Sequence, residues 1–164
     1  MIPHHFATNR RPSSAIVAAD AVLMPLLPRK SILAIAAVID IAIYAQGQPV
    51  AAKELATRHR LSPRYLEPVL QALVHHGILK GVRGPRGGYE LAREQHRISA
   101  DDIVRATGTV GDSGELARGE SNLLDRVVIP ALALAEQSFS VTLSRISVED
   151  LVRSVEALRP SLRG

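Results

Sequence analysis

The sequence predicts a mainly α-helical protein with one short β-hairpin, and three observations support this fold class. Aliphatic residues dominate, because 46% of the chain is hydrophobic but only 3% is aromatic, a composition that suits helices. Apolar side chains recur at helical spacing in several segments bounded by glycine or proline. Only two short segments, 78–82 and 89–92, have the character of β-strands. At 164 residues the chain fits one domain, or a small domain with an oligomerisation arm.

The composition excludes several kinds of chemistry. The chain has no cysteine, which rules out disulfides, thiolate nucleophiles, cysteine zinc sites and thiolate-bound iron–sulfur clusters. Six histidines remain, and none falls in a His-x-x-x-His or HExxH pattern, so no metal site is predicted. No nucleophile–base pair or carboxylate pair stands out, which argues against an enzyme.

Positive charge is concentrated in the middle of the chain. The net charge is +4, but residues 53–97 carry nine Lys or Arg and four Asp or Glu, a formal charge of +5. Residues 98–164 carry seven and ten, a formal charge of −3. This asymmetry favours an anionic partner for the basic part, with nucleic acid the first candidate. A solvated basic surface without a partner explains the same charge equally well.

Residues 1–24 are expected to form a flexible N-terminal extension. An apolar stretch within it follows an Arg-Arg pair and superficially resembles a signal peptide, but Asp20 interrupts the stretch. Met24 competes with Met1 as the true start of the protein. We therefore expect a cytoplasmic location.

The first helix is expected over Ser31–Ala45, in a run that is apolar apart from Asp40. This run is shorter than the roughly 20 residues that a membrane helix needs, and Gly47 ends it, so no membrane partner is predicted. A helix that is apolar on nearly all sides is buried on nearly all sides, which suggests that a second chain covers one of its faces.

Two further helices follow in quick succession. The second is expected over Pro49–Arg60, with Arg58 and His59 facing outward. The third begins at Ser62, which caps free backbone N–H groups ahead of a proline, and it ends at Gly77. Two short helices joined by a tight turn have the plan of a helix-turn-helix. An ordinary helical hairpin fits the same local pattern.

A basic hairpin comes directly after the third helix. The strands expected at Ile78–Val82 and Tyr89–Ala92 flank a Gly-rich loop that permits positive backbone φ angles. Arg83 and Arg86 project from this loop, where arginine enters a narrow DNA minor groove or neutralises phosphates. Such a hairpin is a wing, so residues 25–107 are expected to form a winged helix-turn-helix. A phosphate cradle for a nucleotide is the rival interpretation, but no GxxxxGK[ST] motif is present.

Two capped helices and a loop are expected after the wing. Ser99 caps a helix that ends in Gly108, and residues 108–121 contain four glycines and are expected to be a flexible loop. Near the C-terminus, Ser147 begins a last short helix that ends near Leu158.

A long apolar helix is expected between these two segments. It runs from Asn122 to Leu143 and is kinked or tightened near Pro130. The small domain before it cannot cover its apolar surface. Residues 122–164 are therefore expected to form a homodimer through this dimerisation helix, and one core helix within a single chain is the alternative.

With its elements in this order, the chain resembles the Rrf2 family of bacterial winged helix-turn-helix transcription regulators. The residues that carry the match are Leu61–Glu67, Leu73–Leu79, Arg83–Arg93 and Ile98–Ile103. The resemblance implies a homodimer that binds a pseudo-palindromic promoter site in double-stranded DNA, usually as a repressor. Its two recognition helices would enter successive major grooves.

The resemblance also assigns the DNA contacts. Arg64 is expected to reach a guanine edge or a phosphate, and Glu67 to accept a hydrogen bond from a cytosine amino group. The hydroxyl of Tyr65 contacts a phosphate, or its ring packs on the helix-turn-helix core. The full set of expected DNA-binding residues is Ser62, Arg64, Tyr65, Glu67, Lys80, Arg83 and Arg86.

Two departures from the family pattern matter. Pro68 stands where family members often carry a long polar side chain such as Gln, so one base contact is expected to be missing. The best-known members sense through three cysteines in the loop before the dimerisation helix, but residues 108–121 contain neither cysteine nor histidine. The iron–sulfur chemistry therefore does not carry over, and no cofactor is expected.

The leading hypothesis is a sequence-specific, homodimeric DNA-binding repressor that acts without an iron–sulfur cluster. Its signal, if it has one, comes from a small molecule bound near the dimerisation helix or from a protein partner. The alternative is a protein-interaction adaptor that kept the fold but lost DNA binding. Salt-sensitive binding to duplex DNA separates the two hypotheses.

Overall fold

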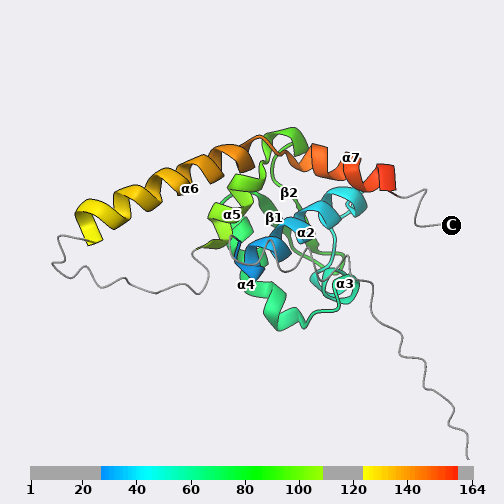
Figure 1. Cartoon of the computed structure of the whole chain (residues 1–164). Helices are drawn as coiled ribbons and strands as arrows, with labels where there is room; N and C mark the ends of the chain where they lie inside the picture. Colours follow the sequence, from blue (N-terminus) through cyan, green and yellow to red (C-terminus); the bar gives the residue numbers. More distant parts are fainter. Residues whose placement is uncertain (1–26, 109–123, 159–164) are drawn as a thin grey trace, which may run out of the picture.

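The computed structural model describes residues 27–108 and 124–158 (Figure 1). The extension expected at 1–24 lies outside these residues, as does all but the first residue of the loop expected at 108–121. The elements in chain order are α2 (Arg29–Tyr44), α3 (Ala52–Arg58), α4 (Pro63–His75), β1 (Leu79–Val82), β2 (Gly88–Leu91), η1 (Gln95–Arg97), α5 (Ala100–Gly108), η2 (Leu124–Val128), α6 (Ile129–Ser144) and α7 (Val148–Leu158). The predicted fold class, mainly helical with an antiparallel two-stranded wing, is confirmed.

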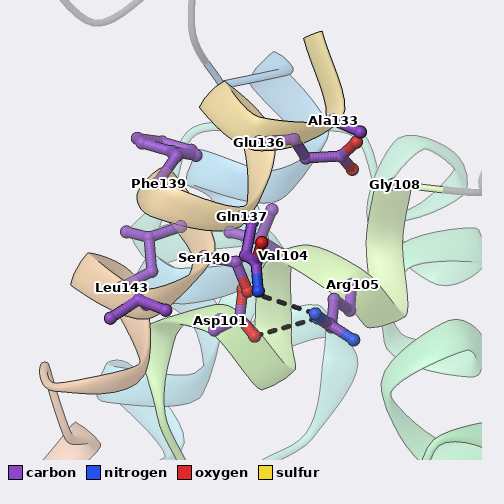
Figure 2. A pocket seen from close by; sticks show the side chains of 11 residues that line it. Asp101, Val104, Arg105, Gly108, Ala133, Glu136, Gln137, Phe139, Ser140 and Leu143 are labelled. Atoms are coloured by element: carbon purple, nitrogen blue, oxygen red, sulfur yellow. Dashed lines mark hydrogen bonds and ion pairs between the residues drawn. The ribbon is translucent and has the colours of Figure 1, made fainter. Parts of the chain in front are cut away.

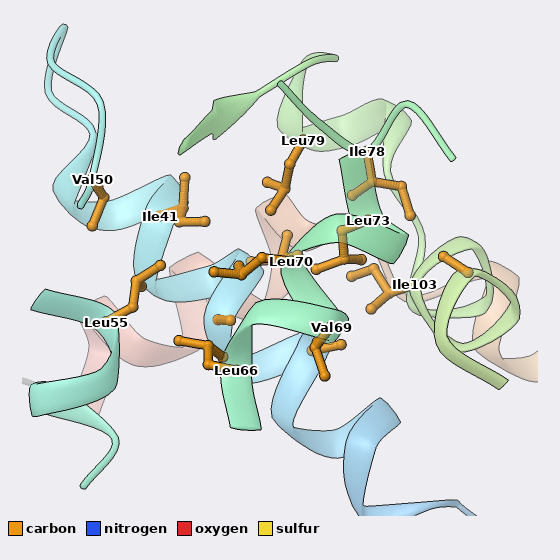
Figure 3. Packing of buried hydrophobic residues seen from close by; sticks show 14 of the residues in the cluster. Ile41, Val50, Leu55, Leu66, Val69, Leu70, Leu73, Ile78, Leu79 and Ile103 are labelled. Atoms are coloured by element: carbon orange, nitrogen blue, oxygen red, sulfur yellow. The ribbon is translucent and has the colours of Figure 1, made fainter. Parts of the chain in front are cut away.

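An aliphatic core centred on α2 holds together the head, which comprises α2 to α5 with β1 and β2. α2 packs against α4, α5, α7 and β2. The fully buried side chains of the core include Ile41, Leu66, Leu70, Leu73 and Ile103 (Figure 3). The sequence suggested that a second chain covers part of this helix. Elements of the same chain bury Ala37, Val38 and Ile41 but leave Ile32 and Leu33 only half-buried, so covering of that face by a second chain stays a prediction.

Two capping boxes begin α5 and α7 and lie side by side. The amide of Ser99 donates to Asp102 Oδ2 at 3.0 Å, and the Asp102 amide donates to Ser99 Oγ at 3.1 Å. Ser147 and Asp150 exchange the same two bonds, each 3.1 Å long. The hydroxyl and amide of Ser147 hold the pKa of Asp150 below its usual value. These bonds confirm both predicted caps. An isolated β-bridge between Ser99 and Ser147 joins the starts of the two helices.

Several element boundaries differ from the prediction by a few residues, and one backbone pairing explains the start of α3. α3 begins at Ala52 rather than Pro49, because Val50 exchanges two backbone hydrogen bonds of 2.9 Å with Tyr89 and is extended rather than helical. The strands of the wing are four residues each, and their paired ends are Leu79 with Leu91 and Val82 with Gly88. The predicted strand bounds were therefore wrong by one residue.

The arm, formed by η2 and α6, extends away from the head (Figure 1). A π-helical turn precedes α6, so the backbone widens where the sequence predicted a kink or a tightening. Pro130 lies just after this turn, and because the helix continues from η2 into α6, its missing N–H removes one helical hydrogen bond at their junction. Leu143 is the one buried side chain of α6, whereas Leu132 and Leu134 are 64% and 68% exposed. The arm is apolar and largely uncovered.

An ion pair fastens α3 to α2. Asp40 is buried in α2, and Arg58 donates to its two carboxylate oxygens over 2.6–3.0 Å. The Arg58 guanidinium also lies 4.5 Å from the centre of the Tyr44 ring, and hydrogen bonding to Asp40 raises the pKa of Arg58. Nε2 of His59 lies 3.1 Å from the same carboxylate without hydrogen-bonding to it. Arg58 is exposed as predicted, although it reaches across to a partner on another helix, whereas the outward placement predicted for His59 was wrong, because its side chain is half-buried beside Asp40.

We predict that Asp40→Asn lowers the free energy of unfolding by about 1–3 kcal/mol, because Arg58 loses its counter-charge in a partly buried position. Urea denaturation measures this change. Glu149→Gln is the matched control, since it removes the charge of an exposed carboxylate that pairs with Arg153 at 3.0 Å and should cost less than about 0.5 kcal/mol. Equal stability of the two variants would contradict a structural role for the Asp40–Arg58 pair.

Candidate nucleic-acid interface

α4 has one buried side and one exposed side. Its buried side chains are Leu66, Val69, Leu70 and Leu73. The residues predicted to bind DNA from this helix and its N-cap are all exposed, and they are Ser62, Arg64, Tyr65 and Glu67. Because the buried stripe recurs every three or four residues, it turns the polar residues toward solvent as a set. The geometry of a recognition helix is therefore present.

Gln71 extends the exposed side of α4 by one turn and is not among the residues predicted from the sequence. It lies four residues after Glu67, so the two share a face. It also lines a groove between α4 and the wing, together with Arg83. The spacing from Glu67 is the sequence signal that identifies it. α4 continues through Pro68, which is exposed and supplies no polar group on this face.

Ser62 occupies the N-cap position of α4, but its hydroxyl makes no capping hydrogen bond. The amide of Tyr65, which such a cap would bind, instead donates to the Ser62 carbonyl at 3.0 Å. The predicted side-chain cap was therefore wrong. The hydroxyl is exposed and remains available to an external partner.

Tyr65 lies at the edge of a groove between α2 and the start of α4. Its side chain is 44% exposed, and the groove also includes Arg29, Ile32 and Ser62. This position combines the two roles that the sequence left open, because the ring borders apolar residues of α2 while part of it remains in solvent.

The wing presents two basic side chains without a partner and one with a partner. Arg83 and Arg86 are exposed, and in the described part of the chain neither makes a hydrogen bond or an ion pair. Lys80 faces Glu90 across the two strands, with Nζ 3.0 Å from Oε2. The predicted residue Lys80 therefore has its charge offset within the wing, whereas the two arginines do not.

Backbone geometry fixes the position of the wing. Gly84 has a φ of +114°, and the amide of Gly87 donates to its carbonyl at 2.9 Å to close the turn. Gly88 packs directly against the backbone of Val50, where a side chain would collide with the carbonyl. This close approach lets Tyr89 form its bridge to Val50, just before α3. The wing is thus joined to the helix-turn-helix by backbone hydrogen bonds.

The residues described offer no metal centre. They contain no group of three histidine, aspartate or glutamate side chains arranged to hold an ion. The chain also lacks cysteine throughout, so its donor set does not fit an iron–sulfur cluster held by thiolates. The chemistry of this surface is that of exposed arginine and polar groups.

Besides the two grooves beside α4, a cavity of about 750 Å³ lies between α5 and α6 (Figure 2). Arg105 spans it, with Nε 2.9 Å from Asp101 Oδ2 and Nη2 3.1 Å from Ser140 Oγ. Phe139 and Val104 supply apolar lining. The cavity thus combines polar and apolar groups at the junction of the head and the arm.

Arg126–Ser144 is the one helical stretch of the described residues that is long and apolar enough, at 19 residues, to cross a membrane. In the sequence, the run considered as a membrane helix was Ser31–Ala45, and its helix contributes to the core of the head. Length and composition are the only features that indicate membrane crossing here. Within the described structure, 6% of this stretch is buried. Glu136 lies within it, and a charge at that depth is costly in a bilayer.

Comparisons with known proteins agree with this geometry. The Rrf2 family model, described as an iron-dependent transcriptional regulator, matches residues 27–154. The regulator IscR of Xenorhabdus nematophila is 33% identical over 139 residues, which cover 80% of this chain and 82% of that protein. The structure of T. potens IscR aligns with a TM-score of 0.62 and 29% identity over 82% of this chain and 90% of that one. CymR, the global cysteine regulator of B. subtilis, aligns with a TM-score of 0.57 and 27% identity over 78% of this chain and 96% of that one.

These matches settle the class of the protein. The family model spans most of the chain, and the relatives are helix-turn-helix regulators rather than enzymes. The sequence resemblance to this family is confirmed, as is the winged helix-turn-helix fold. The chain belongs to the Rrf2 family and is a DNA-binding transcriptional regulator without cysteine.

Proposed function

We propose that the protein is a homodimeric repressor that reads a pseudo-palindromic DNA site with α4 and the wing. The observation that carries this proposal is the joint exposure of the polar side of α4 and the two unpaired wing arginines. The bridge between Val50 and Tyr89 joins the wing to the segment before α3, and β1 packs against α4. A recognition helix and a wing in fixed relation bind a major groove and the adjacent minor groove together.

α4 supplies the contacts that read sequence. Arg64 and Glu67 are exposed in its first turns, where recognition helices contact base edges, and they suit guanine and the cytosine amino group respectively. Gln71 joins them one turn later and suits adenine. Ser62 and Tyr65, at the start of the helix, contact the flanking phosphates.

The wing supplies electrostatic attachment. Arg83 and Arg86 enter the minor groove or neutralise phosphates. Neither has an ion pair in the described structure, so no intramolecular pair must break before they bind DNA. Lys80 contributes less, because Glu90 must release it first.

Dimerisation covers the arm. The exposed leucines of α6 are apolar surface that a single chain leaves in water, and a second copy packed along α6 removes this surface from solvent. Two heads held about one helical turn of DNA apart, roughly 34 Å, match successive major grooves.

The protein then acts in the cytoplasm, where its DNA is found. The cavity beside Arg105 is the place for a small-molecule effector, since it lies between head and arm.

We predict that Arg83→Ala weakens binding to a selected genomic fragment by about ten-fold without changing the oligomeric state. Lys80→Ala is the matched control from the same wing, and it should cost less than about three-fold because Glu90 already offsets the charge of Lys80. Gel-shift titration measures both. Unchanged affinity in Arg83→Ala would remove this arginine from the interface. An absence of salt-sensitive duplex binding by the wild-type protein would favour the adaptor.

We predict that Arg64→Ala reduces discrimination between the selected fragment and random duplex by about 10- to 100-fold, because a base contact is worth about 1–3 kcal/mol. Competition binding with the two duplexes gives this ratio. An equal loss of affinity on both duplexes would assign Arg64 to a phosphate instead of a base.

We predict that the double variant Leu132→Glu/Leu134→Glu raises the dimer dissociation constant by at least 100-fold, because each change puts charge into an apolar interface. Sedimentation velocity should show the wild-type protein at about twice the 17.7 kDa of one chain. Leu158→Glu, at an exposed apolar position in α7, is the control and should leave the dimer intact. A monomeric wild-type protein, or one that sediments with lipid vesicles, would contradict the proposed arm.

A further inference from the structure

Arg60 has a backbone conformation that favours glycine. Its φ is +53°, and among the described residues it is the one non-glycine with a positive φ. L-residues with a side chain adopt this left-handed region at a cost, because Cβ crowds the backbone. The turn of a helix-turn-helix often contains glycine for this reason. An arginine at this position is therefore unfavourable for folding.

The end of α3 imposes this conformation. The amide of Leu61 donates to the carbonyl of Ala56 at 2.8 Å, and the amide of Arg60 donates to that of Thr57 at 3.2 Å. These two bonds form a Schellman motif, in which the residue after the helix cap turns left-handed. The positive φ thus belongs to the fold of the turn and is independent of what the Arg60 side chain does.

The side chain of Arg60 makes no interaction within the described structure that would offset this cost. It is exposed, and it has neither a hydrogen bond nor an ion pair in the described residues. It lines one groove together with Arg29, His59, Ser62 and Tyr65, and no acidic residue borders that groove. Arg60 therefore adds an unpaired positive charge to the surface from which α4 begins.

We propose that Arg60 binds a phosphate of the DNA backbone beside the major groove that α4 enters, and that the strained turn is kept for this contact. This inference rests on the proposed mode of DNA binding. In a helix-turn-helix the recognition helix enters the groove by its N-terminal residues while the preceding helix crosses the backbone, so the turn between them lies near the phosphates. Ser62 and Tyr65, which share the groove with Arg60, are the neighbouring phosphate contacts.

Arg60→Gly tests the proposal because it should change stability and affinity in opposite directions. Relief of the positive φ raises the midpoint of thermal unfolding by about 1–4 °C. Loss of the phosphate contact weakens binding about three- to ten-fold, equally for a selected fragment and for random duplex. The slope of log affinity against log salt becomes shallower by about one unit for each protomer on the DNA.

Two further variants complete the experiment. Arg60→Lys keeps the charge and should retain most of the salt slope, and Arg145→Gly removes an exposed charge at the end of α6 and should leave the slope unchanged. A more stable Arg60→Gly variant with the wild-type salt slope would overturn the phosphate contact. If Arg83→Ala still weakens binding in that case, the proposed DNA-binding mode stands without Arg60. If neither variant affects binding, the DNA-binding mode itself is wrong.

Discussion

Burial of one side of α4 is the constraint on which the rest of the structure depends. Leu66, Val69, Leu70 and Leu73 must all lie in the core around α2, and this requirement leaves no freedom in how α4 is rotated. Arg64 and Glu67 are exposed as a direct consequence. The pairing of Val50 with Tyr89 then joins the wing to the start of α3, and β1 packs against α4 itself. Aliphatic packing thus sets the geometry of a polar surface to which it contributes no atoms.

The head and the arm satisfy the hydrophobic effect in different ways. In the head, elements of the same chain cover α2, so the basic surface is carried by a unit with its own core. In the arm, α6 has apolar residues on every side and one buried side chain. In the proposed dimer, a second copy covers this surface. The head therefore has a core of its own, whereas the arm would gain one only in the proposed dimer.

Local signals in the sequence predicted most of this arrangement. The caps at Ser99 and Ser147, the glycines of the wing and the stripe of α4 each depend on residues a few positions apart, and the structure contains them all. The side-chain cap at Ser62 was a local prediction that failed, and the other errors came from contacts between distant segments. The start of α3 depends on the pairing of Val50 with Tyr89.

The same limit applied to the side chains around the candidate site. The partner of Arg58 could not be foreseen, because Asp40 lies on another helix, 18 residues earlier in the chain. The role proposed for Arg60 depends on a backbone φ that the residue type disfavours, so no propensity could indicate it. Gln71 was within reach of sequence analysis, because its spacing from Glu67 places both on one face of α4.

The most direct test of the account is to select fragments of the organism's own DNA with the purified protein and to sequence those that it retains. A dimer that reads DNA through two copies of α4 should enrich an inverted repeat with half-sites centred about ten base pairs apart. It should do so without added iron or sulfide, because the chain has no cysteine to hold a cluster. Retained fragments that share no repeat, or only a single half-site, would contradict the account.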